Sequence, residues 1–274
     1  MISLLAPNVD VDWVCHVMMG GAEHELSKLH ASIFFVRIGT DSDWKKVERM
    51  TRAGGVDGWL VYGPVNDEVV DRLNSSKLPF IILGDHRCTQ PVHSVNSDNE
   101  AAGRLAVQHL ASLGHRRIGL LDGEMQFVYQ EQTSAGFRAA VRELRLDDEE
   151  RLITHDASLL SKPTGERVIE WLRTTSPTAL FVPDCDWAIA VSRILRESQV
   201  HVPNEISVVT CDPVAVVAKS HGFTHIQLPL SEVGHQGALL LHRLASERDA
   251  GPGEVKIPPV LVEGWTARPP RNRP

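Results

Sequence analysis

The chain has 274 residues, of which 42% are hydrophobic and 23% are charged. This composition is typical of a folded globular protein and excludes the disordered and coiled-coil classes. The formal net charge is −7, and a surface with that balance repels nucleic acid unless its positive charge is localised. The basic residues are scattered, apart from the arginines of the proline-rich segment 268–274. We read that segment as a frayed end.

The four cysteines are widely separated and include no CxxC pair: they are Cys15, Cys88, Cys185 and Cys211. A chain of this length does not need disulfides, so we expect free thiols in a reducing compartment. The segment 1–13 lacks the basic region of a signal peptide. No stretch reaches the roughly 18 apolar residues that a membrane span needs. The sequence therefore predicts a cytoplasmic protein without membrane contact.

Short apolar runs alternate with amphipathic segments along the chain, which is typical of a parallel sheet flanked by helices. In the first part we expect strands at 2–6, 31–38, 59–62 and 80–84. Between them we expect helices at 13–29, 44–52 and 67–74. The run ASIFFVRI is apolar almost throughout, which indicates a strand buried on both faces.

The alternation restarts near residue 97. Ser97 stands three residues before Glu100, which favours a capping box at the start of a helix that ends at Gly114. Beyond it we expect strands at 118–121, 152–155, 179–182 and 206–210. We expect helices at 134–144, 164–173 and 188–197. Two arrays of similar length indicate a weak internal duplication.

The remaining segment holds an extended run at 224–230, a helix at about 232–248 and a final strand pair around 255–263. It is too small for a core of its own, so it must complete the two arrays. The predicted fold class is α/β, with two Rossmann-like lobes joined by three crossover segments and a ligand cleft between their strand ends. We place the N-terminal lobe at 1–96 plus 228–256, the C-terminal lobe at 97–227 plus 257–268, and a tail at 269–274.

Five motifs together carry a family resemblance. They are VNSDNEAAGRLAVQHLASLGHRRIGLLDG at 95–123, SAGFRAAV at 134–141, VPNEISVVTCD at 202–212, THIQLPLSEVGHQGALLLHRL at 224–244 and VLVEGWTARPP at 260–270. The chain resembles the effector-binding domain of lactose/galactose-repressor (LacI/GalR) transcription regulators, which has the fold of type I periplasmic binding proteins. The resemblance covers essentially the whole chain. It implies a small polar effector, a sugar or sugar derivative first, and a homodimer whose contact face includes the outer helices near 44–52 and 67–74.

The family places a helix-turn-helix headpiece before this domain, whereas Met1 here runs directly into the first predicted strand. The resemblance therefore implies that DNA is bound only through a headpiece that is not in this chain. Either the chain is a trimmed effector domain or it is a headless relative, and we favour the first interpretation. We favour a repressor over an activator.

The resemblance implies ligand-binding residues at the strand ends. Asp212 follows the predicted strand 206–210, where an acid of the family holds ligand hydroxyls; a helix cap or a solvated loop acid is the alternative. Trp13 follows the first strand, where the family often carries a stacking aromatic, and ordinary packing of the first helix is the alternative. Asn8 and Asp12 share its loop and are weaker candidates.

Two positions depart from the family pattern. Asp184 replaces the usual asparagine, which favours ligands with donors or positive charge, while Trp187 suits packing and a pocket wall equally. Thr133 stands where the family very often has an arginine, and threonine cannot supply that fork of donors. Gln126 and Tyr129 are nearby substitutes for it. The alternative is that no residue replaces this arginine, and that the predicted cleft binds ligands poorly.

The sequence shows no nucleophile elbow, P-loop or dinucleotide-binding glycine motif, so we expect no catalytic residue and no cofactor. His221 and His225 lack further ligands at metal-binding spacing, and we expect both at the surface and no metal site. A solute-binding protein of a transport system, which would need export, is one alternative function. A hydrolase is another, because fold alone does not decide chemistry.

Overall fold

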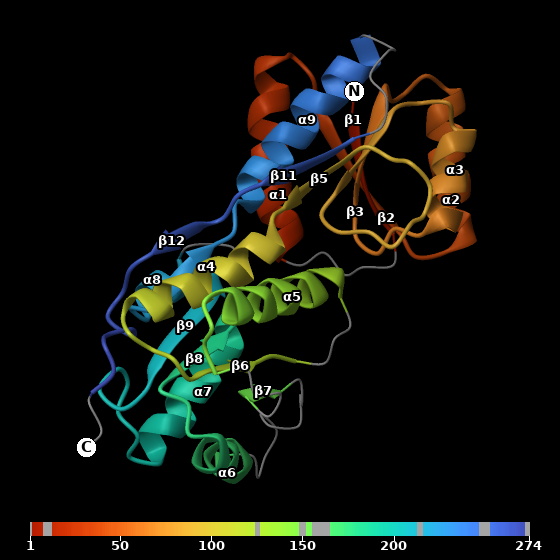
Figure 1. Cartoon of the computed structure of the whole chain (residues 1–274). Coiled ribbons are helices and arrows are strands. Elements are labelled where there is room, and N and C mark those ends of the chain that lie inside the picture. The colour runs from red at the N-terminus through yellow and green to blue at the C-terminus, as the bar shows by residue number, and fades with distance from the viewer. Residues whose placement is uncertain are drawn as a thin grey trace. The chain divides into compact units, whose positions relative to one another are not determined.

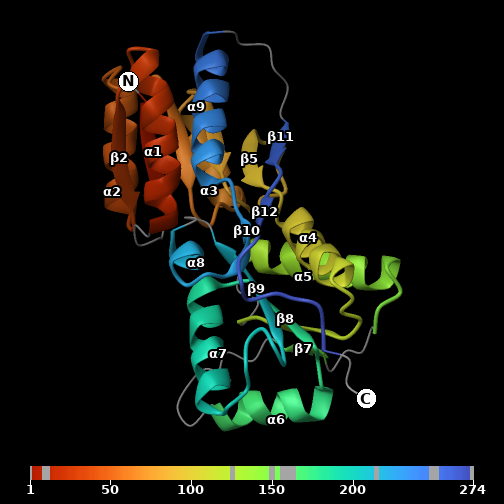
Figure 2. The same cartoon turned by 90° about the vertical axis from the view of Figure 1, so that its left-hand side faces the viewer.

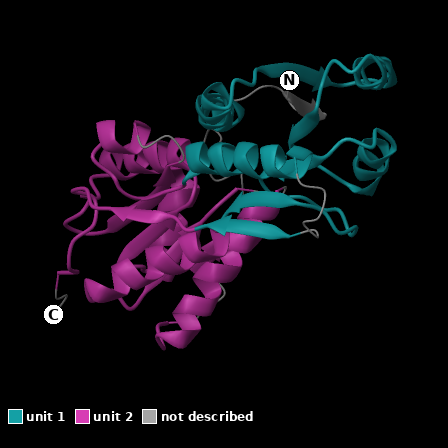
Figure 3. Ribbon diagram, turned by 90° about the horizontal axis from the view of Figure 1, so that it is seen from above, with its two compact units in different colours: residues 1–97, 229–257 teal, residues 98–228, 258–274 magenta. Residues whose placement is uncertain are grey.

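The computed structural model describes residues 2–7, 13–123, 127–147, 152–154, 165–212, 216–246 and 253–271. The chain divides into two compact units, which Figure 3 colours separately. Unit 1 consists of residues 1–97 and 229–257, and unit 2 of residues 98–228 and 258–274. The chain therefore passes between the units three times, and the predicted fold class of two α/β lobes with three crossovers is confirmed. Within the described ranges, no helix is both long and apolar enough to span a bilayer.

Unit 1 is built on a parallel sheet with the strand order β11-β5-β4-β3-β1-β2. Its strands are β1 (Ile2–Pro7), β2 (Ile33–Ile38), β3 (Gly58–Tyr62), β4 (Phe80–Leu83), β5 (Ser94–Ser97) and β11 (Glu254–Ile257). Its helices are α1 (Trp13–Lys28), α2 (Asp41–Arg52), α3 (Asp67–Ser75) and α9 (Leu230–Ser246). The returning segment thus contributes one helix and one edge strand to unit 1.

The alternation along β3 explains how the sheet of unit 1 is covered. Trp59 and Val61 pack into one core cluster with apolar residues of α2 and α3. Leu60 points to the opposite face, where Gly237 of α9 leaves room for it and for Leu83. Figure 1 shows the resulting layers, with α2 and α3 on one side of this sheet and α1 and α9 on the other.

Unit 2 repeats this plan with the strand order β12-β10-β9-β8-β6-β7. Its strands are β6 (Ile118–Leu121), β7 (Ile153–Thr154), β8 (Ala179–Val182), β9 (Ser207–Asp212), β10 (Thr224–Gln227) and β12 (Val260–Val262). Its helices are α4 (Asn99–Ser112), α5 (Val128–Glu143), α6 (Gly165–Thr175), α7 (Cys185–Glu197) and the single turn α8 (Val217–Ser220). The neighbours pair in parallel except β12, which runs antiparallel to β10.

Two apolar layers enclose the sheet of unit 2. On one face, α4 and α5 pack on residues such as Leu120 and Phe181. On the other face, α6 and α7 pack on Leu121, Leu180 and Val182. Figure 2 shows α4 and α5 on one side of β8 and β9 and α7 on the other. Since successive side chains of β8 serve opposite faces, the run ALFV is fully buried.

Glycines permit a close helix crossing in each unit. A Cβ at Gly21 or Gly234 would collide with backbone of the partner helix where α1 crosses α9. Gly103 and Gly136 play the same part where α4 crosses α5, since a Cβ there would collide with backbone at Thr133 and Glu100 respectively. Each crossing is closer than any larger side chain would allow.

A buried histidine ties the C-terminal segment to unit 2. His115 is 1% exposed, and its Nδ1 lies 2.8 Å from the Thr178 hydroxyl. Its Nε2 lies 2.8 Å from the Arg268 carbonyl oxygen, which also accepts a hydrogen bond from the Ser207 hydroxyl. Polar groups from four distant parts of the chain therefore satisfy one another inside the unit.

Five sequence-based expectations need correction. The strand predicted at 31–38 is not buried on both faces, because β2 is the edge strand of unit 1 and Phe34 is 55% exposed. The capping box at Ser97 is wrong, because Ser97 ends β5 and the side chain of Asp98 caps α4 by accepting the Ala101 N–H. The final strand pair is wrong, because β11 joins the sheet of unit 1 and β12 that of unit 2. The predicted helix at 134–144 begins earlier, at Val128. His225 is buried rather than at the surface, with 1% of its area exposed.

Candidate functional site

Three carboxyl groups gather at the carboxyl ends of neighbouring strands in unit 2. The register places Leu120 of β6 beside Phe181 of β8, and Phe181 beside Val209 of β9. Asp122, Asp184 and Asp212 follow those paired residues by two or three positions. Because the strands are parallel, all three acids emerge at the same edge of the sheet. This is the edge at which open α/β sheets bind ligands.

Asp122 is almost as deeply buried as Asp212, and it was not among the residues predicted from the sequence. It is 3% exposed, and its Oδ1 accepts a hydrogen bond of 2.8 Å from the Gly123 N–H. Its Oδ2 is buried without a hydrogen-bond partner among the described residues. Burial raises the pKa of Asp122 to about 6, because its effect outweighs the lowering of the pKa by the Gly123 N–H and the nearby Gln130 amide. The charge of Asp184 adds a smaller rise. The only signal in the sequence is its place, directly after the apolar run IGLL.

Asp184 lies at the start of α7 and is its N-cap. Its Oδ1 accepts the Trp187 N–H at 2.8 Å. The residue as a whole is exposed, yet partial burial of its carboxyl group raises the pKa, and the neighbouring charge of Asp186 adds to that effect. A cap leaves carboxylate lone pairs for other donors. Asp184 is therefore accessible to a ligand and carries a charge that its surroundings disfavour.

Asp212 is the last residue of β9 and is 1% exposed. Its Oδ2 accepts the Ala218 N–H of the short helix α8 at 2.6 Å. This bond gives Asp212 the capping role that was the alternative to ligand binding. The two roles are compatible, because an ionised carboxylate offers several acceptor positions.

Two cysteine thiols lie near these acids, and the pKa of each thiol is raised by the charges of the acids. Cys211 is buried, and burial together with the charges of Asp122, Asp184 and Asp212 holds the pKa of its thiol far above the usual range. The pKa of Cys185 is raised to about 12 by burial and then by Asp212 and its acidic neighbours. Both thiols stay protonated, and all four cysteines of the chain are free. The edge is thus a concentration of negative charge.

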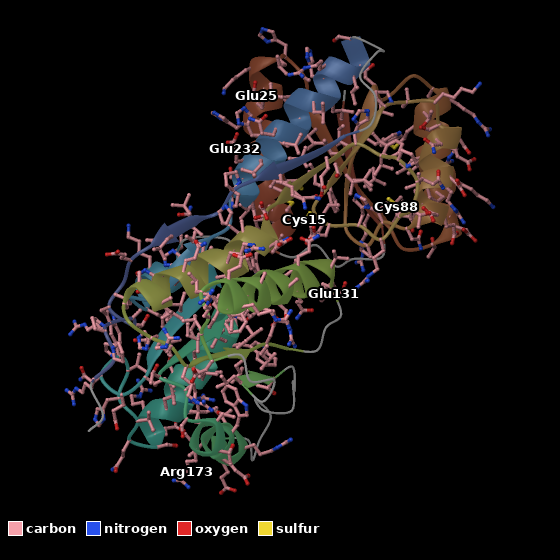
Figure 4. All side chains as sticks on the ribbon, viewed as in Figure 1. Cys15, Glu25, Cys88, Glu131, Arg173 and Glu232 are labelled. Atoms are coloured by element: carbon pink, nitrogen blue, oxygen red, sulfur yellow. The ribbon has the colours of Figure 1, made fainter. Side chains whose placement is uncertain are left out.

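Aromatic side chains lie close to this edge at the start of α5. Phe127 and Tyr129 are both exposed, and their rings stack at 5.7 Å with an interplanar angle of 14°. The amide oxygen of Gln130 accepts the Phe127 N–H at 3.1 Å and so fixes the helix start. Figure 4 labels Glu131, which marks this end of α5. Tyr129 was a predicted site residue, whereas Phe127 was not.

The other predicted site residues lie in different surroundings. Thr133 is 4% exposed, and its carbonyl oxygen lies against Gly103 where α4 and α5 cross. Trp187 is half-buried and packs on the core of α6 and α7, with its ring beside Gly123. Trp13 begins α1 in unit 1 and is 46% exposed. Asn8, Asp12 and Gln126 lie outside the described residues.

Unit 1 places different chemistry at the ends of its strands. The thiol of Cys88 lies 3.0 Å from Nδ1 of His86, in the segment that follows β4. Burial lowers the pKa of His86 and raises the pKa of Cys88, so neither group is charged near neutral pH. Figure 4 labels Cys88. Across the described parts of both units, no group of three His, Cys, Asp or Glu side chains is arranged to hold a metal ion.

A hollow of about 330 Å³ lies elsewhere in unit 2. Residues of α6 and of the segments before β8 and β9 line it, including Leu172, Arg173 and Ile206. Arg173 is labelled in Figure 4. These segments precede the strands, so the hollow is at the amino ends of β8 and β9 rather than at the acidic edge. We assign no function to it.

Comparison with known proteins agrees with this architecture. The profile of the periplasmic binding protein-like domain matches residues 107–266. The HTH-type transcriptional regulator reg1 of Streptomyces lividans is 30% identical over 210 residues, which cover 74% of this chain and 60% of that protein. The chain spans about 60% of the length of the curated relatives it matches.

Solved structures of LacI-type regulators share the fold. A regulatory protein of the LacI family from Chloroflexus aggregans superposes with a TM-score of 0.84 at 18% identity, over 97% of this chain and 98% of that one. A LacI family transcriptional regulator from Enterococcus faecium, solved with bound ribose, gives a TM-score of 0.77 at 22% identity, over 97% and 99%. The profile match shows that the chain belongs to the periplasmic binding protein-like domain family, and the superpositions show that it shares the fold of LacI-type regulators.

Proposed function

We propose that this chain is the effector-sensing part of a transcriptional repressor, and that it binds a small polar molecule, a sugar or sugar derivative first. The observation that carries the proposal is the gathering of Asp122, Asp184 and Asp212 at the carboxyl ends of β6, β8 and β9. In open α/β sheets this is the edge that receives ligands. The shared cleft between two lobes that the sequence predicts stays a prediction.

The chemistry of the edge suits a polyol. Carboxylates accept hydrogen bonds from hydroxyl groups, and their charge strengthens each bond. The exposed rings of Phe127 and Tyr129 suit the apolar face of a sugar ring, and the sequence assigns the same role to Trp13 of unit 1. The neighbour from Enterococcus faecium holds ribose, which supports a sugar as the first class to test.

We further infer that the sensor controls DNA binding in an intact homodimeric regulator. The relative reg1 is described as a helix-turn-helix regulator, and we assign the DNA contact to such a headpiece rather than to these two units. A ligand that prefers one conformation of the protein shifts the population by its differential affinity. Helices α2 and α3 are the expected dimer face, and light scattering coupled to size-exclusion chromatography measures the oligomeric state.

A thermal-shift screen of sugars, polyols, nucleobases and amino acids tests the ligand class, because a specific ligand raises the melting temperature by mass action. We expect a hit among the sugars, weakened by Asp212→Asn and by Trp13→Ala. Phe34→Ala is the matched control, since Phe34 is an exposed aromatic of unit 1 on a different element, β2. A hit that neither variant weakens would move the site elsewhere. No hit in any class would contradict the sensing function.

A further inference from the structure

Asp122 and Asp184 are not balanced by positive charge within the described part of unit 2. Asp122 and Asp184 both have raised pKa values, and the contributions to them contain no lysine, arginine or histidine. Among the titratable groups of the described residues, only these acids, Asp212 and Cys185 act on the pKa of the buried Cys211 thiol. Buried charge of one sign is costly, and proteins usually place a counter-charge beside it.

A second observation is independent of the charge count. The Oδ2 atom of Asp122 is fully buried and has no hydrogen-bond partner among the described residues. Most buried polar atoms are paired, so an orphaned carboxylate oxygen calls for an explanation such as an absent ligand. Two contacts place Asp122 inside the cluster. The charge of Asp184 acts on its pKa. Gly123, the next residue, lies against the ring of Trp187, and the backbone N–H of Trp187 donates to Asp184.

Thr133 of α5, one of the predicted site residues, adds no positive charge to this unit. Threonine has one hydroxyl and no positive charge, and here it is 4% exposed within the α4–α5 crossing. Two exposed aromatic rings, Phe127 and Tyr129, lie on the same helix one turn or more before it. Faces of aromatic rings attract cations. Both features therefore favour a ligand that brings positive charge.

We propose that the effector carries a protonated amine, as an amino sugar does, and that the ammonium group pairs with Asp184 in the field of Asp122. The inference rests on the proposed function, because it names the chemical class of ligand for that same edge. Asp184 is the accessible partner, since it is exposed and only one of its oxygens is used in capping α7. Asp122 lies behind it and supplies charge that the ammonium would offset.

Matched ligands of the same ring but different charge test the inference by isothermal titration calorimetry on the whole chain. The probes are glucosamine, galactosamine and mannosamine, each beside its neutral parent sugar and its N-acetyl form, with glucuronate as the anionic counterpart. We expect at least one amino sugar to bind about tenfold or more tightly than its parent and N-acetyl forms, the free-energy equivalent of about one pKa unit. Glucuronate should not bind.

Two isosteric variants locate the charge. Asp184→Asn keeps a side-chain oxygen to cap α7, and Asp122→Asn keeps one to accept the Gly123 N–H, so both should fold, as their melting without ligand will show. Each should abolish the preference for the amino sugar. Asp147→Asn is the control, because Asp147 is an exposed acid of unit 2 paired with Arg117.

The outcomes separate this inference from the proposed function. A neutral sugar that binds as well as its amino form overturns the inference and leaves the sensing function intact. An amino-sugar preference that survives both variants also overturns the inference. If no sugar of any charge binds, the inference is overturned, and the sensing function is then decided by the other ligand classes of the thermal-shift screen.

Discussion

Units 1 and 2 have the same strand order but different residues at the ends of their strands. Strands β1, β3 and β4 occupy in unit 1 the places that β6, β8 and β9 occupy in unit 2. Gly63 and Gly84 follow β3 and β4 with positive φ angles of 119° and 91°. In unit 2, Asp184 and Asp212 stand at the corresponding ends, whereas of β3 and β4 in unit 1 only β4 is followed closely by an acid, Asp85. The comparison teaches that topology sets where a ligand can bind, while a few residues at the turns decide which unit supplies the charge.

The returning segment also serves the two units differently. In unit 1, β11 pairs in parallel with β5, and Glu254 accepts a hydrogen bond of 2.8 Å from the buried Asn96 amide. In unit 2, β12 pairs antiparallel with β10, and the chain beyond it is held by His115. Each unit therefore completes its sheet with a strand from the same segment but fixes that strand by a different contact.

The helix crossings should give the largest effects, and equal ones in both units. Gly103→Ala in unit 2 and Gly234→Ala in unit 1 each force a Cβ into the backbone of the partner helix. We expect each to lower the free energy of unfolding by more than about 3 kcal/mol, at the upper end of overpacking costs. Urea unfolding followed by circular dichroism measures this.

Gly20→Ala is the control for the crossings. Gly20 lies on α1 with open space around it, so alanine there should stabilise by about 0.5–1 kcal/mol through helix propensity. If Gly103→Ala lowered the free energy of unfolding no more than Gly20→Ala does, the described close contact between α4 and α5 would be contradicted.

The acidic edge should make unit 2 sensitive to pH. Asp122 has its ordinary pKa of 3.8 in the unfolded chain and a pKa of about 6 in the folded unit. Between these values the folded state binds more protons than the unfolded chain, so the cost of ionising Asp122 builds up from about pH 4 to about pH 6. It is complete above this window and vanishes below it. Asp122→Asn should therefore raise the free energy of unfolding by about 3 kcal/mol at pH 7.5 and leave it unchanged near pH 4.

Urea titrations of the variant and the parent at both pH values check this prediction. Groups other than Asp122 titrate alike in the two proteins, so their contribution cancels in the difference between the two unfolding free energies. Asp147→Asn, at an exposed acid of the same unit, should show no such gain at pH 7.5. A variant less stable than the parent at pH 7.5 would mean that Asp122 has a cationic partner.

The sequence predicts the apolar strands well and the polar ones poorly. The run ALFV coincides with β8, because four consecutive buried apolar residues leave little choice. Strand β5 was missed, since its sequence SVNS is mostly polar although all four residues are buried. The start of α5 was placed too late, because the segment before Ser134 lacks apolar periodicity and is fixed by the Gln130 side chain.

For the candidate site, the sequence could indicate the right edge but not its electrostatics. Asp184 and Asp212 were chosen by their places after strands, and their roles as ligand contacts stay predictions. Asp122 was missed because one acid after an apolar run carries no signature, and its burial depends on α5 and α7 packing around it. Burial is set by tertiary contacts, which is why perturbed pKa values escape a reading of the chain alone.

The histidine anchor should matter in unit 2 alone. His115→Ala removes one hydrogen bond from the Thr178 hydroxyl and one from the Arg268 carbonyl, at a cost of about 2 kcal/mol for the two buried bonds. The bonds of these groups to the Arg117 carbonyl and the Ser207 hydroxyl remain. Amide hydrogen exchange should speed up at residues 264–271 and stay unchanged in β11. His24→Ala, at an exposed histidine of α1, is the control. Equal loss of protection in β11 would show that the two ends of the returning segment are not fixed separately.

The caps of α3 and α7 give the smallest and most direct comparison, because these helices follow the corresponding strands β3 and β8. Asn66 caps α3 by accepting the Val69 N–H at 3.1 Å, and Asp184 caps α7 by accepting the Trp187 N–H at 2.8 Å. Asn66→Ala should cost about 1 kcal/mol of unfolding free energy through loss of the cap. Asp184→Asn should cost less than about 0.5 kcal/mol, because asparagine caps as well as aspartate does. If urea unfolding shows the second variant to be the costlier one, the charge of Asp184 serves the fold, since a helix amino end favours an anion. If Asp184→Asn is the less costly variant, asparagine serves as well as aspartate at this cap. The negative charge of Asp184 then does not contribute to stability, which agrees with a role in ligand binding.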